Sequence, residues 1–286
     1  MVRACLTDEE NARLSVIAAK DYLYRENVWL SALQSGLSRV GLDEITEEGK
    51  ITLFGHDKDR STYYLHLFPM WGFEDTGDLG DIDATRVRAM FFTGAVDGLK
   101  QNVPWPVFQQ LIPEMGTEKY LELVEEYKYI LDYKKLWSNS PFPVTFVTTD
   151  AVIIKSGHVL LVKRRGYPGR GLFALPGGFL EQHERIIDGC LRETEEETQL
   201  GVPKEELKKR IVEQRVFDHP DRSLRGRTIT HASCIDLGSG PLPKVKGADD
   251  ADPHGTGWMP LRDVFANEEG FFEDHFHIVD YFVSRY

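Results

Sequence analysis

Apolar and polar residues alternate with different periods along the first half of this chain. Between residues 12 and 37 apolar side chains recur every three or four positions, which is the period of an amphipathic helix. Residues 50–54 and 63–68 are apolar-rich runs around a polar turn, and they predict two short strands. From Lys119 to Trp137 charged and apolar residues interleave, which predicts a further helix. The first half is therefore predicted to be mixed α/β.

The Ser/Asn/Pro-rich run SNSPFP, residues 138–143, is typical of a linker and marks a predicted domain boundary. It separates a domain of residues 1–138 from one of residues 144–286. The second domain opens with VTFVTTDAVII and HVLLVKRR, two runs rich in β-branched residues that Lys155-Ser156-Gly157 joins into a predicted hairpin. Further strands are predicted at 172–175, 212–217 and 228–237, and helices at 184–199 and 274–284.

Composition narrows the classes of partner. Asp and Glu total 46 against 34 Lys and Arg, so the formal net charge is −12, and without a basic block this disfavours a nucleic-acid partner. No apolar run approaches the roughly 20 residues of a membrane span, and the first residues lack a signal-peptide pattern, so a cytoplasmic enzyme is expected. Cys5, Cys190 and Cys234 fit no metal-ligand spacing and are expected to be reduced and buried.

The most informative segment is GGFLEQHERIIDGCLRETEEETQL, residues 177–200, in which a glycine turn opens an acidic helix. At about 100° per residue, four side chains share a stripe suited to packing on a sheet: Ile187, Cys190, Leu191 and Thr194. Glu193, Glu196 and Glu197 share a neighbouring face, whereas Glu195 points elsewhere. Taken alone, such a run is usually a solvated face. The alternative is a site for a hard cation such as Mg²⁺, which binds oxygen ligands.

The spacing around this helix favours the metal site. Gly178 is followed after five residues by Glu184 and after seven more by Arg192-Glu193-Thr194-Glu195-Glu196-Glu197, a pattern that resembles the Nudix box of the Nudix hydrolases. The resemblance implies an α/β/α-sandwich domain with a mixed sheet. It also implies Mg²⁺, or alternatively Mn²⁺, bound by Glu193, Glu196, Glu197 and the Gly178 carbonyl. Glu184 would be an accessory acid, and Arg192 would orient Glu193 as part of the catalytic set.

Two positions depart from the Nudix box. Thr194 stands where an aliphatic residue is usual, and Gln199 replaces a glycine near the helix end. Neither change removes a charge. We expect a modest packing loss at Thr194 and a helix that continues into Leu200 and Gly201.

The region after the box is rich in arginine and suggests how a phosphorylated substrate is bound. Residues 216–237 contain arginines that could offset phosphate charge, although a solvated hairpin tip with weak surface ion pairs is the alternative. DHPDRSLRGRTITHA, EEETQL, KGADDA and FFEDHFHIVDYF resemble the Nudix half of bifunctional nicotinamide mononucleotide (NMN) adenylyltransferase/ADP-ribose pyrophosphatases. That resemblance implies hydrolysis of ADP-ribose to AMP and ribose 5-phosphate in NAD-related metabolism.

Several site assignments follow as predictions. The candidate substrate-binding residues are Arg164, Arg165, Phe217, Arg225 and Arg227, with Arg170 nearby. The general base stays open among Glu196, Glu197 and Asp250. Three histidines are weaker alternatives, because a lone histidine is more often structural: His183, His219 and His231.

The first half resembles the later segments of the adenylyltransferase domain of the same bifunctional proteins. AKDYLYRENVWL, FGHDKDRSTYYLHLFPMW and IDATRVRAMFF carry this likeness, and residues 82–88 correspond to an ISSTxxR-like phosphate-binding motif. Thr85, Arg86 and Arg88 would then be a vestigial nucleotide-binding set. The sequence contains no H-x-G-H motif, so we expect an incomplete Rossmann-like nucleotidyltransferase domain. Residual adenylyl transfer and a catalytically inactive nucleotide sensor are alternative functions, and a homodimer is left open.

Overall fold

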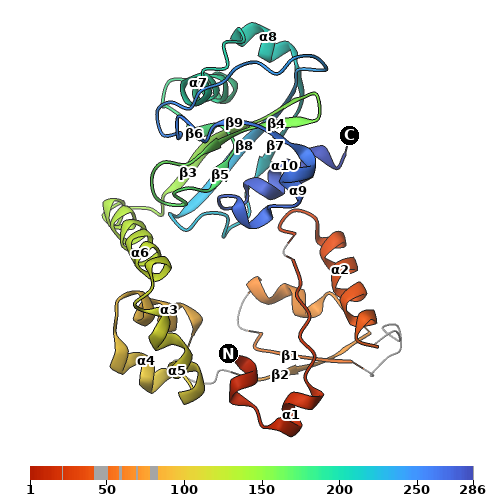
Figure 1. Cartoon of the computed structure of the whole chain (residues 1–286), viewed down its shortest axis with the longest axis vertical. Helices are drawn as coiled ribbons and strands as arrows, with labels where there is room; N and C mark the ends of the chain where they lie inside the picture. The colour runs from red at the N-terminus through yellow and green to blue at the C-terminus, as the bar shows by residue number, and fades with distance from the viewer. Residues whose placement is uncertain (21, 42–50, 58–59, 69, 78–82, 286) are drawn as a thin grey trace. The chain divides into compact units, whose positions relative to one another are not determined.

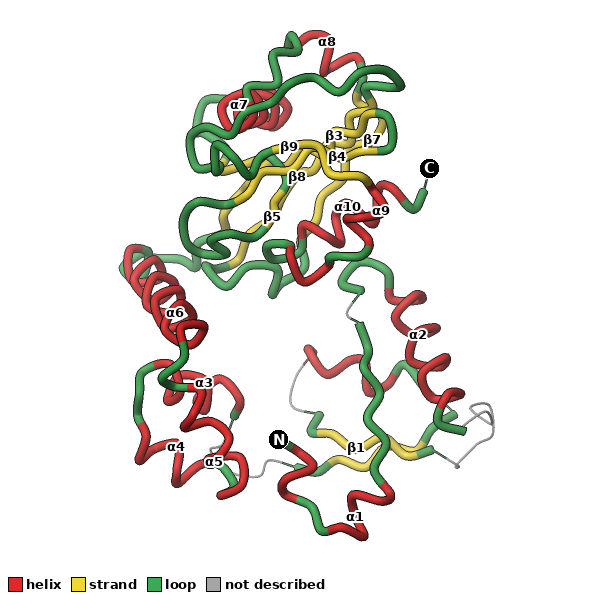
Figure 2. Tube along the Cα trace, in the orientation of Figure 1, coloured by secondary structure: helices red, strands yellow, loops and turns green. Residues whose placement is uncertain are grey.

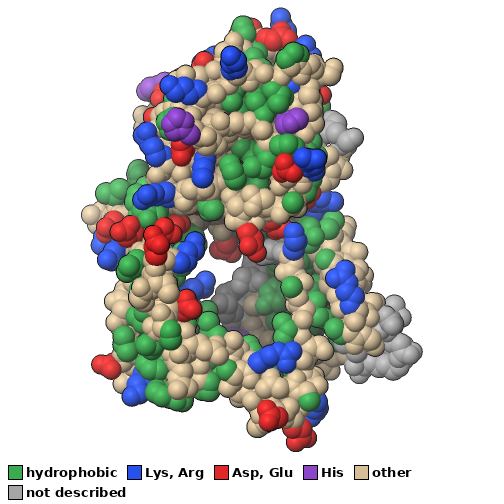
Figure 3. Space-filling view, viewed as in Figure 1, with side chains coloured by type: hydrophobic (Ala, Val, Ile, Leu, Met, Phe, Trp, Pro, Cys, Tyr) green, Lys and Arg blue, Asp and Glu red, His purple; other side chains and the backbone are tan. Residues whose placement is uncertain are grey.

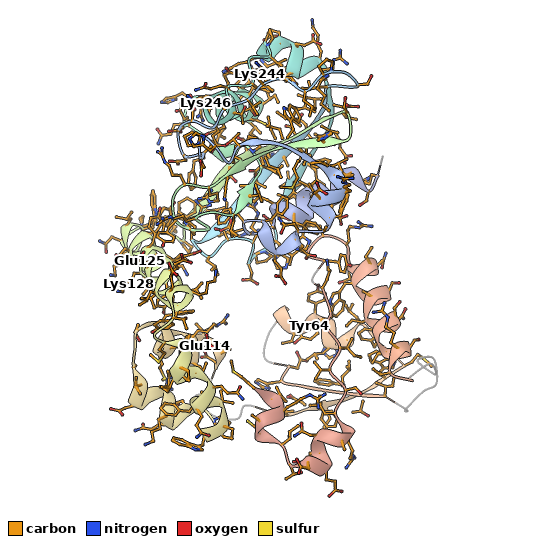
Figure 4. The ribbon with its side chains drawn as sticks, in the orientation of Figure 1. Tyr64, Glu114, Glu125, Lys128, Lys244 and Lys246 are labelled. Carbon is orange, nitrogen blue, oxygen red and sulfur yellow. The ribbon has the colours of Figure 1, made fainter. Side chains whose placement is uncertain are left out.

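The structure, a computed structural model, describes residues 1–20, 22–41, 51–57, 60–68, 70–77 and 83–285. Two compact units make up the chain: unit 1 comprises Met1–Tyr22 and Glu26–Glu125, and unit 2 comprises Leu23–Arg25 and Glu126–Tyr286. The division falls inside helix α6 (Glu118–Leu136), so that Glu125 belongs to unit 1 and Lys128 to unit 2 (Figure 4). The SNSPFP segment proposed as the boundary follows the end of this helix.

Unit 1 combines helices with a two-stranded parallel sheet (Figure 2). Its strands are β1 (Thr52–Gly55) and β2 (Gly72–Asp75). Its helices before α6 are η1 (Val2–Cys5), α1 (Asp8–Arg13), α2 (Glu26–Arg39), η2 (Arg60–His66), α3 (Ala84–Phe92), α4 (Val96–Asn102) and α5 (Trp105–Glu114). These elements confirm a mixed α/β region.

Two predicted elements of unit 1 differ from the structure. The helix expected over residues 12–37 forms only as α2, because α1 ends at Arg13 and Leu14 is extended. The strand expected over residues 63–68 was wrong, since this stretch lies largely in the 3₁₀ helix η2. Asp57 stabilises this 3₁₀ helix, because its carboxylate accepts hydrogen bonds from Thr62 at 2.7 Å and His66 at 2.9 Å. Residue 50, the start of the other predicted strand, lies outside the described residues.

Unit 2 is built on a mixed seven-stranded sheet with the central order β5-β4-β3-β8-β7, and with β6 paired to β3 and β9 to β4. The strands are β3 (Thr145–Lys155), β4 (His158–Lys163), β5 (Phe173–Ala174), β6 (Gly177–Phe179), β7 (Ile211–Phe217), β8 (Arg227–Asp236) and β9 (Gly257–Pro260). Strands β3 and β8 are parallel, whereas the other pairs in this sheet are antiparallel. The predicted hairpin is confirmed as β3–β4. Strand β9 was not predicted, and β6 forms where a glycine turn was expected.

Helices cover both faces of this sheet (Figure 1). Helices α7 (Ile186–Thr198) and α8 (Lys204–Lys209) lie on one face, and α9 (Leu261–Phe265), η3 (Glu268–Gly270) and α10 (His275–Val283) lie on the other. Successive side chains of a strand point to opposite faces of the sheet, so β3 contributes residues to the hydrophobic core on each face. Ala151 and Ile153 pack with Leu191 of α7, while Val152 belongs to the cluster that contains Phe282 of α10. The α/β/α sandwich is therefore confirmed.

Two expectations about single residues and spans can also be compared with the structure. Cys190 and Cys234 are buried as expected, whereas Cys5 is exposed, because the short helix η1 that carries it contributes no buried residue. Within the described part of the chain, no helix combines the length and apolarity that crossing a membrane requires.

Candidate active site

Helix α7 carries the predicted carboxylate face and packs onto the sheet as its periodicity indicated. Cys190, Leu191 and Thr194 are fully buried and Ile187 is partly buried, which confirms the core stripe. The Thr194 hydroxyl donates a hydrogen bond to the Cys190 carbonyl at 2.8 Å. The polar substitution in the stripe is therefore accommodated because the helix itself satisfies the hydroxyl.

The end of α7 differs from the prediction. The helix stops at Thr198, and Gln199 adopts the left-handed conformation with φ 47° and ψ 44°. The Gly201 N–H then donates to the Glu195 carboxylate at 3.1 Å, which fixes the turn. The expectation of a helix continuing through Leu200 was wrong, because a left-handed C-cap reverses the chain even without glycine at that position.

Arg192 organises the acidic residues around α7. Its guanidinium donates to Glu184 at 2.7 Å, to Glu193 at 2.9 Å and to Glu196 at 2.8 Å. The hydrogen bonds from Arg192 hold the pKa of Glu184 below its ordinary value. One cation therefore offsets the repulsion among three carboxylates, two on α7 and one in the turn just before it.

Glu193 and one further carboxylate, Glu197, pack against strand β6, which precedes α7. A Cβ atom on Gly178 would lie 2.5 Å from the Glu193 carboxylate, so a larger residue there would displace the end of that side chain. Glu197 is buried and accepts a hydrogen bond from the Gly177 N–H at 2.9 Å. Burial raises the pKa of Glu193, and it raises the pKa of Glu197 to about 8. Both carboxylates are thus held in surroundings that disfavour uncompensated negative charge.

The donor types of this cluster suit a divalent cation. Carboxylate oxygens and a backbone carbonyl are the ligands that Mg²⁺ and Mn²⁺ take. In the part of the chain that the structure describes, however, no group of three or more His, Cys, Asp or Glu side chains stands ready to hold a metal ion. Instead, the Arg192 guanidinium donates hydrogen bonds to Glu193 and Glu196, and the Gly177 N–H donates one to Glu197. A bound cation would replace some of these contacts and offset the charge of the two desolvated carboxylates.

Two of the predicted arginines converge beside this cluster. The Arg164 guanidinium lies 4.1 Å from the centroid of the Phe272 ring, and that of Arg225 lies 5.8 Å from the same ring and 5.4 Å from Phe179. Burial, and next the nearby charge of Arg225, lower the pKa of Arg164, while the charges of Glu273 and then Glu197 oppose this shift. The two guanidinium groups lie close to the carboxylates, and Glu273 pairs with Arg225 at 3.9 Å and offsets part of their charge. Together they could hold a diphosphate.

The KGADDA loop, residues 246–251, passes over the C-terminal end of helix α7. Its backbone donates from Lys246 to the Thr198 carbonyl at 2.9 Å and from Ala248 to the Glu197 carbonyl at 3.1 Å. Lys244 and Lys246 lie next to α7 in Figure 4. Asp250 follows on this loop, and its carbonyl accepts from the Arg165 N–H at 3.1 Å. The loop thus brings an exposed acid close to both the carboxylates and the strand that carries Arg164.

Comparison with known proteins agrees with this arrangement. The model of the NUDIX domain matches residues 144–282. The structure of a bifunctional NMN adenylyltransferase/ADP ribose pyrophosphatase from Francisella tularensis is 33% identical with a TM-score of 0.86, and the match covers 99% of this chain and 83% of that one. The chain therefore belongs to the Nudix family. A structure of the same kind of bifunctional protein from Francisella tularensis, complexed with AMP and a manganese ion, matches with 33% identity, a TM-score of 0.82 and coverage of 93% and 77%.

Two curated relatives match shorter stretches. An ADP-ribose pyrophosphatase of Methanocaldococcus jannaschii is 40% identical over 105 residues, which is 37% of this chain and 57% of that protein. A nicotinamide/nicotinic acid mononucleotide adenylyltransferase of Acinetobacter baylyi is 26% identical over 129 residues, 45% of this chain and 65% of that protein. The chain thus spans less than two thirds of each of these relatives.

Several predicted substrate residues of the Nudix domain take other places. Phe217 is 0% exposed and packs against Tyr24, Tyr281 and Phe282, so its assignment to substrate binding was wrong: the side chain faces the core below α10. Arg227 donates to the Asp218 carbonyl at 2.6 Å and braces the arginine-rich loop. The side chains of Arg165 and Arg170 are exposed.

The histidine alternatives are distributed around the Nudix domain. His183 is exposed, and His219 accepts a hydrogen bond from the Asp221 N–H at 3.3 Å. His231 lines a hollow of about 560 Å³ whose other lining residues are Glu184, Arg185, Ile186, Ile187, Gln214, Arg215 and Val216. This hollow shares Glu184 with the Nudix box and lacks the three candidate metal ligands, so it is distinct from the predicted metal site.

Sequence reasoning missed a set of buried polar residues at and near the start of α10. Arg222 is buried and makes two hydrogen bonds, of 2.7 and 2.8 Å, with Asp274. His275 is also buried, and its Nδ1 accepts from the Leu175 N–H at 2.9 Å, 4.0 Å from Asp150. The segment FFEDHFHIVDYF, residues 271–282, has the pattern of an amphipathic helix. Only the fold shows that its polar residues Asp274 and His275 are buried.

The candidate nucleotide motif of unit 1 lies at the start of α3. Asp83 caps this helix, because its carboxylate accepts from the Arg86 N–H at 2.6 Å. Thr85, Arg86 and Arg88 are exposed in the first turns, and residue 82 of the motif lies outside the described residues.

Proposed function

We propose that the chain is a divalent-metal-dependent pyrophosphohydrolase that converts ADP-ribose to AMP and ribose 5-phosphate. One observation carries this proposal: the box carboxylates around Arg192 lie next to two arginines, Arg164 and Arg225, that share one phenylalanine ring. Carboxylates suit a cation, and paired arginines suit a diphosphate. The 40% identity to an ADP-ribose pyrophosphatase supports ADP-ribose among the diphosphates.

Each residue has a distinct part in this reaction. Glu193, Glu196 and Glu197, with the Gly178 carbonyl, would hold Mg²⁺, or Mn²⁺ in its place, which when bound supplies charge neutralisation and an acidic water. Arg164 and Arg225 offset the negative charge of the diphosphate. Water forms a new P–O bond at one phosphorus, the bridging P–O bond breaks, and a carboxylate takes the proton of the water. Glu196, Glu197 and Asp250 are the candidates for that base.

The first assay follows AMP release from ADP-ribose by the purified full chain, with and without Mg²⁺. NADH, diadenosine polyphosphates and 8-oxo-dGTP serve as competing substrates. We expect metal-dependent AMP release that is fastest from ADP-ribose. A preference for another compound would overturn the substrate, and turnover of none of them with binding retained would favour a nucleotide sensor.

Unit 1 supports a narrower proposal, which is nucleotide binding without adenylyl transfer. The Acinetobacter baylyi relative and the exposed hydroxyl and arginines at the start of α3 support binding. The chain lacks the paired histidines of H-x-G-H that would stabilise a transferring phosphate. Incubation with NMN and ATP should therefore yield no NAD, and detectable NAD would overturn this part.

A further inference from the structure

A row of aromatic side chains runs from Phe179, beside the carboxylate of Glu193, to the end of helix α6. Its members, which we call the aromatic wall, are Tyr133 of α6, Trp137 directly after the end of α6, Phe146 of β3 and Phe179 of β6. The ring centroids of Trp137 and Phe146 are 5.3 Å apart, those of Tyr133 and Phe146 are 5.8 Å apart, and those of Phe146 and Phe179 are 5.8 Å apart. Helix α6 precedes the matched Nudix residues 144–282, yet Tyr133 in its last turn packs onto their first strand.

The two ends of the aromatic wall remain accessible. Phe179 is 41% exposed and Trp137 is 45% exposed, whereas Phe146 between them is largely covered. Hydrophobic side chains lie among acidic and basic ones over α6 in Figure 3. Two large rings held in place by a covered third ring provide rigid apolar area for a planar ligand, because little side-chain freedom is left to lose on binding.

The wall is continuous with the groups that would hold the diphosphate. Phe179 directly follows Gly178, against which the Glu193 carboxylate packs. The Arg225 guanidinium lies over the Phe179 ring, and its charge partly offsets the burial that raises the pKa of Tyr133. Carboxylates, arginines and aromatic rings therefore follow one another along this part of unit 2.

We propose that Trp137, directly after the end of α6, and Phe179 stack the purine base of the substrate, while the diphosphate lies between Arg225 and helix α7. The proposal rests on the proposed function only in requiring a nucleoside diphosphate derivative. A base has a π-face that stacks on aromatic rings, whereas a ribose does not. The order of the groups therefore assigns the nucleoside end, rather than the sugar end, to the wall.

The test compares two ligands that differ by the base. AMP and ribose 5-phosphate are titrated separately into the full chain and into Trp137→Ala, with binding followed by calorimetry. We expect Trp137→Ala to weaken AMP binding about tenfold, in the range of one lost stacking contact, and to leave ribose 5-phosphate binding unchanged. Trp137→Phe keeps a ring and should restore most of the AMP affinity.

A matched control is Phe142→Ala, which removes an exposed aromatic ring from the segment just after α6. It should leave both affinities unchanged, and thermal unfolding checks that each variant is folded. Equal weakening of both ligands by Trp137→Ala, an unchanged affinity for AMP, or no AMP binding by the parent chain would each overturn the aromatic wall as a base site. Base-dependent binding without ADP-ribose hydrolysis would instead overturn the proposed function and leave the base site standing.

Discussion

Tyr24 donates a hydrogen bond to Asp274 with an oxygen–oxygen distance of 2.5 Å, although 250 positions separate them in the chain. Residues Leu23–Arg25 belong to unit 2, while the residues on either side belong to unit 1. The Tyr24 ring meets Phe217 edge-on at 4.8 Å, and Arg25 pairs with Asp280 at 2.7 Å. The segment Leu23–Arg25 therefore packs with unit 2, against residues at and near α10.

Replacement of Tyr24 by Phe should destabilise unit 2. The substitution removes a donor from a buried carboxylate, which costs about 1.5–3 kcal/mol when the partner is charged. Urea unfolding followed by circular dichroism measures the change. Tyr129→Phe, which removes the hydroxyl of an exposed tyrosine of the same unit, should change the free energy of unfolding by less than about 0.5 kcal/mol. Equal effects of the two variants would contradict the role given to the Tyr24 hydroxyl.

The Arg222–Asp274 pair predicts an acid-dependent loss of stability. Burial would raise the pKa of Asp274, but the hydrogen bonds and charge of Arg222 outweigh it and leave the pKa below its ordinary value. The folded pKa is therefore lower than the unfolded value of about 3.9, so the pair stabilises fully above that value. This contribution is lost as the pH falls through the folded pKa.

Asp274→Asn tests this pH dependence directly. It should cost about 3 kcal/mol at pH 7, because Arg222 remains buried without its counter-charge. The difference from the parent chain should shrink as urea unfolding is repeated at pH values below about 4. A difference that stays constant between pH 7 and the acid range would show that charge at Asp274 does not contribute.

Glu196→Gln should lower kcat by about 100-fold or more while leaving the fold intact, since it removes charge and not packing. Among the described contacts, the Glu196 carboxylate accepts a hydrogen bond only from Arg192, and the side chain is exposed. Glu195→Gln is the matched control, because Glu195 lies on the same helix and bonds the Gly201 N–H instead. Steady-state hydrolysis of ADP-ribose measures both variants. Full activity of Glu196→Gln would remove Glu196 from the metal site.

Arg86→Ala should leave ADP-ribose hydrolysis nearly unchanged, because Arg86 belongs to unit 1 and the carboxylate cluster belongs to unit 2. The measurement is kcat/KM for ADP-ribose. A loss of more than about tenfold, which corresponds to about 1.4 kcal/mol, would show that the two units act together in catalysis.

Local patterns determined much of the Nudix domain. The β-branched composition of β3 and β8 and the helical period of α7 were visible in the sequence, because both reflect side chains that must pack in a core. Glycine at 178 and the acids at 193, 196 and 197 were likewise found from spacing. The stretch that became η2 was misread, since its apolar residues allow a strand and only the contacts with Asp57 favour the tight helix.

Tertiary structure alone decided which polar residues are buried and which aromatic rings meet. Phe217 and Arg222 occur in the same arginine-rich segment, yet both turned inward, because Tyr24 and Asp274 supply their partners from distant parts of the chain. The aromatic wall likewise joins α6 to β3 and β6, which no period along the sequence connects. The sequence by itself determined the carboxylate helix, since its geometry depends on neighbours three and four residues away. Burial, ion pairing and stacking depend on contacts across the fold, and these only the packed chain decided.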